Sequence, residues 1–489
     1  MAVPAAASAL PGANVPLKKR IKAVNYPGVQ HLHYSYGPIN ILPGQNNIEL
    51  HPNFEKPKVP GYITRFKPNL VYSGTHKVPR VDVIHLHHGV WLLNGYPTFA
   101  AGEEKTTFQL PRGYGYHYNP SDRWGMNYMI HNLWPNTTKV NITYDIDFIP
   151  DSAPAAKSIT PAHPRWMDVA GLSAYPVFNV YRGQGKHGKF TYPNQASTAD
   201  QKAAIGSARE TTFGNDVTLL STAGHLHPGG LYTDMKVSRG AKTKEIFRSQ
   251  AKYFEPAGAV SWDVSMTGTK PSWKVAVKQG DVVHISATYD SRDASWYEVM
   301  GIMVLWYADG IKPGAKDPFK SKIDWHGYLT HGHLAENDNH GGKPQPKVGD
   351  ARKDANGVAA DNIFIKSFVY GLGDFALPGR KGRPPTVKAG QSITFTNLDA
   401  TPAIGPQESA YHTITACRAP CTGTTGIAYP IANANVQFDS GELGYGPPGF
   451  TPAANRNTWK TPKNLRAGTY TYFCRIHPFM RGSFRVIKN

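Results

Sequence analysis

Gly468-Thr-Tyr-Thr-Tyr-Phe473 is followed by Cys474-Arg-Ile-His477-Pro-Phe-Met480 and then by Ser483-Phe-Arg-Val-Ile487. In the two outer segments, aromatic or apolar residues alternate with polar ones, which is the period of a half-buried β-strand. The connecting segment places a thiolate, an imidazole and a thioether within seven residues. This stretch therefore predicts two β-strands with a metal-binding loop between them.

A fourth candidate ligand lies upstream of this loop. His412 belongs to Tyr411-His-Thr-Ile-Thr415, another segment with a β-strand pattern. Two imidazoles, one thiolate and a weakly bound thioether are the ligands of a type 1 copper site, because sulfur suits Cu(I) and imidazole also accepts Cu(II). We therefore expect one type 1 copper ion for electron transfer, held by His412, Cys474, His477 and Met480.

The C-terminal part of the chain, residues 356–489, resembles a cupredoxin of the plastocyanin and amicyanin type. The likeness rests on the Cys-x-x-His-x-x-Met loop and on two upstream segments with β-strand patterns, 363–368 and 387–397. It implies a Greek-key β-sandwich, and this sequence fills every ligand position of the family pattern.

The composition favours an all-β protein with several domains. The 489 residues include 48 glycines and 40 prolines, and 11% of them are aromatic. The formal net charge of +19 comes from basic residues that are scattered along the chain, which disfavours nucleic-acid binding. No apolar stretch of about eighteen residues occurs, so we expect no transmembrane helix.

A first group of histidines lies at the ends of two segments with β-strand patterns. One segment leads into His85-Leu-His87-His88, and His131 ends the other. Strand geometry alone pairs His85 with His87, because residues i and i+2 share a face. The adjacent residues His87 and His88 can bind one ion only at a twisted or bulged strand end. His85 and His88 are therefore both open as partners of His87.

A second group follows further along the chain. His225-Leu-His227 comes after a β-type run, and its two imidazoles can bind one ion together because they share a strand face. Met300 and Met303 lie in a later β-type segment, residues 298–307. Either of them could supply a thioether to the same ion.

Taken in order, these motifs resemble the copper type II, ascorbate-dependent monooxygenases, the family of peptidylglycine and dopamine hydroxylating enzymes. The resemblance covers about residues 30–308 and implies two β-sandwich halves with one copper ion each. It assigns the electron-accepting copper to His87, His88 and His131. It assigns the catalytic, oxygen-binding copper to His225, His227 and Met300. The chain has only three cysteines and so lacks the disulfide framework of the animal enzymes, which leaves the substrate open.

These assignments divide the chain into five parts. We expect an N-terminal arm (1–29), two monooxygenase-like halves (30–154 and 155–308, the second with an insertion), a linker (309–355) and the cupredoxin domain (356–489). The expected fold is all-β, with two β-sandwich halves followed by a Greek-key sandwich. The linker contains histidines that could bind another metal ion or belong to a solvated loop: His326, His331, His333 and His340.

The two remaining cysteines bear on the cellular compartment. Cys417 and Cys421 lie close together and near His412, which predicts a local disulfide and an oxidising environment. The small residues near the N-terminus are typical of the end of a truncated signal peptide. We therefore expect a secreted, periplasmic or cell-surface protein.

The combination of motifs predicts a copper-dependent oxidoreductase with three copper ions. The type 1 domain would take electrons from a redox partner or from a small reductant such as ascorbate. The core would use them, with O2, to hydroxylate a C–H bond of an unknown organic substrate. The alternative is a non-enzymatic electron-transfer or copper-handling protein on an inactive scaffold. A multicopper oxidase or copper nitrite reductase is disfavoured, because Phe473 and Arg475 rather than a histidine flank Cys474.

Overall fold

The structure is a computed structural model that describes most of the chain from residue 20 onward. The described residues are 20–489 without 46–47, 82, 134–135, 171–175, 255–262, 293–294, 333, 335–358, 402–409, 419–435, 446–455 and 478. The predicted disulfide partner Cys421, the linker histidines His333 and His340 and the first nineteen residues of the N-terminal arm lie outside this range.

The first β-sandwich consists of a six-stranded and a four-stranded sheet. The larger sheet has the order β1-β9-β3-β7-β10 with β6 paired to β3, and the smaller one has the order β2-β8-β4-β5. Alternate residues of β9, from Ile142 to Phe148, lie in the same buried core as Phe66 of the neighbouring strand β3 and Trp91 of the other sheet, as expected for the period of a strand. The bounds are β1 (Gln30–Ile41), β2 (Ile48–His51), β3 (Gly61–Tyr72), β4 (Ile84–Leu93), β5 (Tyr96–Gly102), β6 (Phe108–Gln109), β7 (Tyr114–Tyr118), β8 (Trp124–Asn132), β9 (Thr138–Pro150) and β10 (Thr160–Pro161).

The second β-sandwich consists of a five-stranded and a seven-stranded sheet, with a separate pair of strands, β12 and β22. The five-stranded sheet has the order β11-β23-β15-β20 with β16 paired to β23, and the other has the order β13-β21-β17-β18-β19-β24 with β14 paired to β21. Alternate residues of β21, from Val283 to Tyr289, lie in its core. The bounds are β11 (His163–Asp168), β12 (Phe178–Val180), β13 (Lys189–Tyr192), β14 (Glu210–Thr212), β15 (Val217–Ser221), β16 (Gly224–Leu226), β17 (Gly230–Arg239), β18 (Lys242–Tyr253), β19 (Val264–Gly268), β20 (Val275–Val277), β21 (Val282–Asp290), β22 (Trp296–Val299), β23 (Gly301–Asp309) and β24 (Tyr328–Leu329).

The C-terminal domain also has two sheets, with the orders β26-β25-β28-β31 and β27-β33-β32-β29-β30. The strands predicted on either side of the Cys474 loop form β32 and β33, which pair antiparallel with Phe473 opposite Arg481. The bounds are β25 (Asn362–Lys366), β26 (Val369–Tyr370), β27 (Thr386–Lys388), β28 (Thr394–Asn397), β29 (Thr415–Arg418), β30 (Val436–Asp439), β31 (Thr458–Lys460), β32 (Gly468–Phe473) and β33 (Arg481–Ile487).

Helices are few and short among the described residues. They are the α-helices α1 (Ala199–Ala203) and α2 (Gly379–Gly382) and the 3₁₀ helices η1 (Pro154–Ser158) and η2 (Ser207–Arg209). The predicted all-β class is confirmed. Within the described part of the chain, no helix is both long and apolar enough to cross a membrane.

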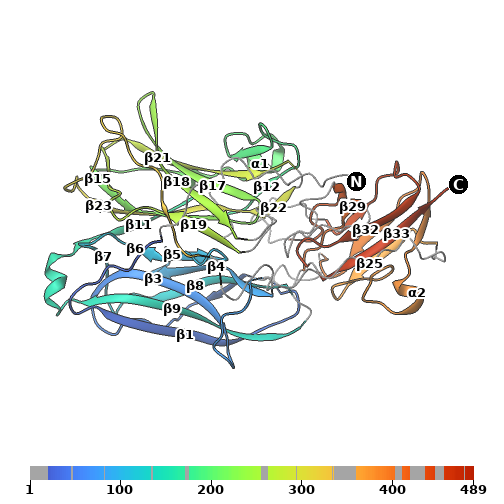
Figure 1. Ribbon diagram of the computed structural model, residues 1–489, viewed down its shortest axis with the longest axis horizontal. Coiled ribbons are helices and arrows are strands. Elements are labelled where there is room, and N and C mark those ends of the chain that lie inside the picture. The colour runs from blue at the N-terminus through green and yellow to red at the C-terminus, as the bar shows by residue number, and fades with distance from the viewer. Residues whose placement is uncertain are drawn as a thin grey trace, which may run out of the picture.

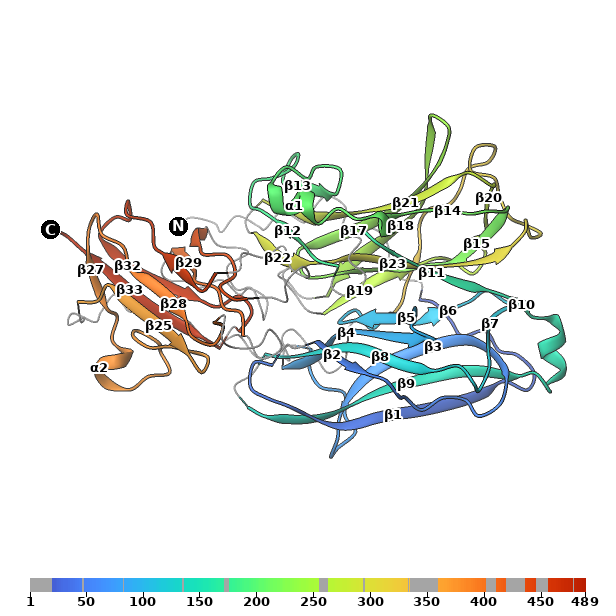
Figure 2. The same cartoon turned by 180° about the vertical axis from the view of Figure 1, so that it is seen from behind.

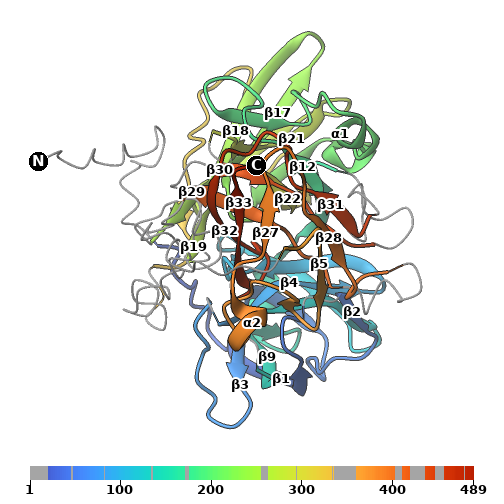
Figure 3. The same cartoon turned by 90° about the vertical axis from the view of Figure 1, so that its right-hand side faces the viewer.

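The two N-terminal sandwiches lie face to face, and the C-terminal domain lies against one end of the pair (Figures 1 and 2). Seen from the side of the C-terminal domain, β4 and β5 of one sandwich and β22 of the other both lie behind it (Figure 3). Side chains of β5 and β23 pack across the face between the sandwiches, with Phe99 and Trp306 ring centroids 5.5 Å apart. This arrangement brings the predicted ligands of all three domains toward one region.

Candidate metal centres

The loop between β32 and β33 is held closed by its own backbone. The Cys474 N–H donates to the Met480 carbonyl at 3.1 Å, and the Met480 N–H donates to the His477 carbonyl at 2.9 Å. His412 reaches this loop from the segment before β29, where it exchanges backbone hydrogen bonds with Leu443. All four predicted type 1 ligands are buried, with exposed fractions of 1% or less.

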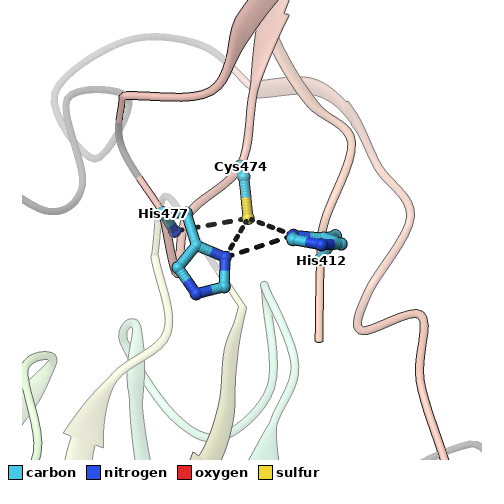
Figure 4. Close-up of side chains that lie close together, drawn as sticks. All are labelled: His412, Cys474 and His477. Carbon is cyan, nitrogen blue, oxygen red and sulfur yellow. Dashed lines mark hydrogen bonds between the residues drawn. The ribbon is translucent and has the colours of Figure 1, made fainter. Parts of the chain in front are cut away.

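Three of these ligands form a tight triangle (Figure 4). The Cys474 Sγ lies 3.9 Å from the His412 Nδ1 and 3.8 Å from the His477 Nδ1, and the two nitrogens are 3.1 Å apart. A point in the plane of these atoms is about 2.1 Å from each, close to the metal–nitrogen and metal–sulfur distances of protein sites. Met480 lies in the same buried cluster as Cys474. The donor set therefore fits a copper ion.

The surroundings of the triangle favour the thiolate form of Cys474, which is the form that binds a metal. Burial raises the pKa of Cys474, but the hydrogen bonds and charges of His412 and His477 outweigh it and bring the pKa well below its usual value. The backbone N–H groups of Thr413 and His477 also point to the sulfur, at 3.4 and 3.3 Å. On the far side of His412, the Nε2 is 3.0 Å from the Asp399 carboxylate, which fixes the ring.

The first group of core histidines lies where β4 and β8 pair. His85 stands directly opposite His131, and a bulge between Leu86 and His88 leaves His87 as the extra residue. The ring centroids of His85 and His87 are 5.3 and 6.0 Å from that of His131. His88 is 5.9 Å from His87, and its Nε2 lies 3.0 Å from the Asn127 Oδ1. The bulge therefore allows both candidate partners, His85 and His88, to approach His87.

In the second group, His225 lies on β16, which pairs with β23, and His227 directly follows β16. His225 and His227 have ring centroids 5.2 Å apart. The pairing of β16 with β23 places His225 opposite Ile302 and Gly224 opposite Met303.

This register separates the two candidate methionines. Met303 belongs to the core of the second sandwich, whereas Met300 is clustered with Ile302 on the face toward the first sandwich. The Tyr289 hydroxyl accepts from the His227 N–H at 3.1 Å and donates to the Met300 carbonyl at 2.5 Å. The backbone of Met300 is thus linked through Tyr289 to that of His227, and Met300 as the thioether ligand stays a prediction.

The two groups meet in one histidine cluster. The ring centroids of His87 and His227, from different sandwiches, are only 4.4 Å apart. Burial, followed by the charges of neighbouring histidines, lowers the pKa values of both well below the usual value, so the rings are neutral and can bind a metal. The buried nitrogens of this cluster that have no hydrogen-bond partner among the described residues include His88 Nδ1, His225 Nε2 and His227 Nε2. This donor set also fits copper.

Two acidic residues that the sequence did not reveal lie beside this cluster. Glu104 Oε2 is 2.8 Å from His225 Nδ1, and Glu104 Oε1 accepts from the Gly102 N–H at 2.9 Å. Burial opposes charge on His225, but Glu104 outweighs it and raises the His225 pKa to about 9. A metal ion at Nε2 would displace the second proton while Nδ1–H still donates to Glu104.

Glu103 is fully buried beside Glu104 and His225, and burial raises the pKa of its carboxyl above the usual value, which favours the protonated form. Ligand atoms of Glu103, Glu104 and His225 all lie within 4.8 Å of one another. In the sequence these glutamates stand in Gly-Glu-Glu-Lys, which is typical of an exposed turn. No spacing in the sequence relates them to His225, so their proximity to this histidine could be recognised only in the folded structure.

The linker histidines do not gather into a site within the described residues. His326 stacks on Trp325 and lies 3.1 Å from Asp324, at the surface. His331 is half-buried, and its Nδ1 is 2.6 Å from the Gly332 carbonyl. A metal site in the linker stays a prediction.

Comparisons with known proteins do not assign the chain to a family. No family model and no curated protein matches it. Among solved structures, it is similar to a purple cupredoxin from Nitrosopumilus maritimus, with 18% identity and a TM-score of 0.15, over 26% of this chain and 98% of that one. It is also similar to a copper-containing nitrite reductase from Thermus scotoductus, with 13% identity and a TM-score of 0.17, over 55% of each chain. The infectious bursal disease virus Gx strain gives 9% identity and a TM-score of 0.18, over 59% of this chain and 74% of that one. Scores this low allow no inference about function, which must therefore be inferred from the geometry of the site.

Proposed function

We propose that this protein is a copper-dependent oxidoreductase in which a type 1 copper domain passes electrons to a histidine-bound copper centre in the core. The type 1 ion would be held by His412, Cys474, His477 and Met480. The observation that carries the proposal is the contact between His477 and the core: its Nε2 lies 2.9 Å from the Gly44 carbonyl, and its ring centroid is 6.2 Å from that of His131.

Two short connections through bonds link the type 1 loop to His131. In the first, His477 Nε2–H donates to the Gly44 carbonyl, and the carbonyl of the next residue, Gln45, accepts from the Asn132 N–H at 2.9 Å. Asn132 follows His131 directly. In the second, the His131 ring forms a hydrogen bond with the backbone of Ile476. Because electron tunnelling falls off less steeply through bonds than through space, these connections favour transfer from the loop to His131.

A polar and aromatic contact fixes the C-terminal domain on the second sandwich as well. The Arg475 guanidinium lies over the rings of Trp296 and Tyr297, at 5.1 and 5.7 Å from the centroids, and donates to Asp439 at 3.0 Å. The Tyr297 hydroxyl donates to the same carboxylate at 3.3 Å. Buried or partly buried arginine contacts of this kind are stronger than exposed ones. The domain is therefore held in the position that places His477 beside His131.

In the core, we propose two copper ions, one at His87, His88 and His131 and one at His225, His227 and Met300. His85 is an alternative to His88. Copper bound there would supply one-electron redox chemistry and a site for O2. The reaction would be C–H + O2 + 2 e⁻ + 2 H⁺ → C–OH + H2O, with the electrons from ascorbate or another small reductant. Glu104 would keep His225 in one orientation by accepting its Nδ1–H.

The proposal is tested by electron paramagnetic resonance with copper quantitation on the intact chain and on Cys474→Ser. The wild-type protein should bind three copper ions, show both type 1 and type 2 signals, and consume O2 when ascorbate is added. Cys474→Ser should lose one ion and the blue absorption, keep the core copper, and consume O2 at least tenfold more slowly. Equal O2 consumption by both proteins would refute electron delivery through the type 1 site.

A non-enzymatic copper-handling role is the second candidate, because the six core histidines are all buried, with exposed fractions of 8% or less. Such burial suits retention of an ion as well as catalysis. Three bound copper ions without any ascorbate-dependent O2 consumption would support this role and exclude the oxygenase.

A further inference from the structure

A cavity of about 60 Å³ lies between the two N-terminal sandwiches and reaches the histidine cluster. Its walls include Val90 and Ala100 of the first sandwich and Ile302 and Val304 of the second. His88 and His225 line it as well, so it adjoins both proposed core sites. The resemblance to hydroxylating enzymes of larger substrates gives no reason to expect a cavity of this size.

Few of the groups that line the cavity could bind a charged ligand, although two of its polar atoms, Thr222 Oγ1 and Gln109 Oε1, are buried without a hydrogen-bond partner among the described residues. The Thr98 hydroxyl donates to the Tyr96 carbonyl at 2.9 Å, and the Ser221 hydroxyl donates to the Gln109 carbonyl at 3.2 Å. Glu104 is engaged by His225 and by the Gly102 N–H. Apart from His88 and His225, the lining contains no basic side chain. The cavity therefore suits an uncharged molecule, since a charged one would lose its hydration without gaining partners.

The volume of the cavity indicates the size of the molecule that it can take up. An apolar protein cavity of about 150 Å³ takes benzene or xenon, whereas a single water needs about 10–15 Å³. At about 60 Å³, this cavity has room for roughly two or three carbon atoms by the same measure. We infer that it is the binding site for a small, uncharged, apolar substrate, such as a short hydrocarbon, presented to the core copper centre. The inference rests on the proposed function.

Occupancy of the cavity can be measured without any activity, with xenon as the probe. Crystals of the wild-type protein under xenon pressure should show one xenon atom between Val90 and Ile302. Ala100→Leu adds three carbon atoms to the wall and should reduce the occupancy at least fivefold, and Val304→Ala removes two and should increase it. Ala203→Leu, the same change as Ala100→Leu at an exposed position of α1, should leave it unchanged. No xenon in the wild-type cavity, or full occupancy in Ala100→Leu, would overturn the inference.

The substrate class is then tested with propane and ascorbate on the copper-loaded chain. The reaction is C3H8 + O2 + 2 e⁻ + 2 H⁺ → C3H7OH + H2O, with both electrons from ascorbate. Wild type should form propanol, and Ala100→Leu should form at least tenfold less with the same copper content and blue absorption. If ascorbate drives O2 consumption but propane is not oxidised, the inference falls and the proposed function stands. If ascorbate drives no O2 consumption at all, the proposed function falls, and the xenon result decides for or against the cavity as a ligand site.

Discussion

The type 1 site and the core histidine cluster differ in how the chain builds them. The ligand triangle of the first is contained in one domain, and three of its four proposed ligands come from one seven-residue loop. The second joins residues of two sandwiches, and its shortest ring contact, between His87 and His227, crosses from one to the other. The type 1 site thus depends on one turn between two strands, whereas the core cluster depends on how two domains pack. Substitutions should therefore act on the two sites independently, except where the domains touch.

The largest expected effect is the selective loss of whole ions. His87 stands at the centre of the core cluster, within 4.4–6.2 Å of four other histidine rings. His87→Ala should therefore lose core copper and abolish O2 consumption while the blue absorption remains. His412→Ala should remove only the type 1 ion and the blue absorption and should leave the core copper in place. Copper quantitation and visible absorption measure both. Loss of blue absorption in His87→Ala would show that the two sites are not independent.

A second, smaller effect should separate the two methionines. Met300→Leu removes the thioether that we propose as a ligand of the core copper but keeps the side chain apolar, so we expect at least a hundredfold loss of substrate hydroxylation with the type 1 site intact. Met303→Leu is the matched control, because Met303 lies in the core of the second sandwich, where such a swap costs less than about 1.5 kcal/mol. Product formation and thermal unfolding measure the two changes. Equal loss of product in both variants would contradict the assignment of Met300.

The sequence could predict the type 1 site more completely than the core. Its ligand spacing and its flanking strands lie within one stretch, and β32 and β33 form where the alternating pattern places them. The glycine, proline and aromatic content, together with the β-strand patterns, also predicted the all-β class, which is confirmed. The sequence indicated only that His87 and His88 would need a bulge in order to bind one ion together. It could not predict the bulge itself, because a bulge depends on the partner strand.

The parts that the sequence could not predict depend on packing between domains. The contact of His87 with His227, the approach of His477 to Gly44 and the cavity at Val90 all depend on the relative position of separate β-sandwiches. The contact of Glu104 with His225 could not be predicted for the same reason, because 121 positions separate the two residues. Hydrophobic periodicity determines which face of a sheet is buried, but it does not determine which face of another sheet covers it.

In both sites, a carboxylate lies beside a proposed histidine ligand. Removing this carboxylate at either site should have a moderate effect on copper affinity, so the two sites can be compared directly. Asp399 lies 3.0 Å from His412 Nε2, and Glu104 lies 2.8 Å from His225 Nδ1. Removing such a partner typically lowers metal affinity by about 10–100-fold. Asp399→Asn should weaken only type 1 copper, and Glu104→Gln only core copper, in competition titrations with a chelator. Weakening of both sites by either variant would contradict the separation of the two.

The smallest expected effect concerns the contact between the sites. Gly44 has a φ of +64°, and a Cβ there would lie 2.3 Å from the Phe368 ring, so Gly44→Ala should push the C-terminal domain away from the carbonyl that holds His477. Gly95→Ala is the matched control, because its φ of +82° imposes the same kind of backbone strain, with nothing within 4 Å of the added carbon. Both variants should keep three copper ions. In Gly44→Ala alone, electron transfer from the type 1 ion to the core should slow by about tenfold. The rate is measured as the return of the blue absorption after the type 1 ion has been reduced by a flash. An unchanged rate would mean that electrons reach His131 without the His477–Gly44 contact, and would leave the Ile476 connection as the main path.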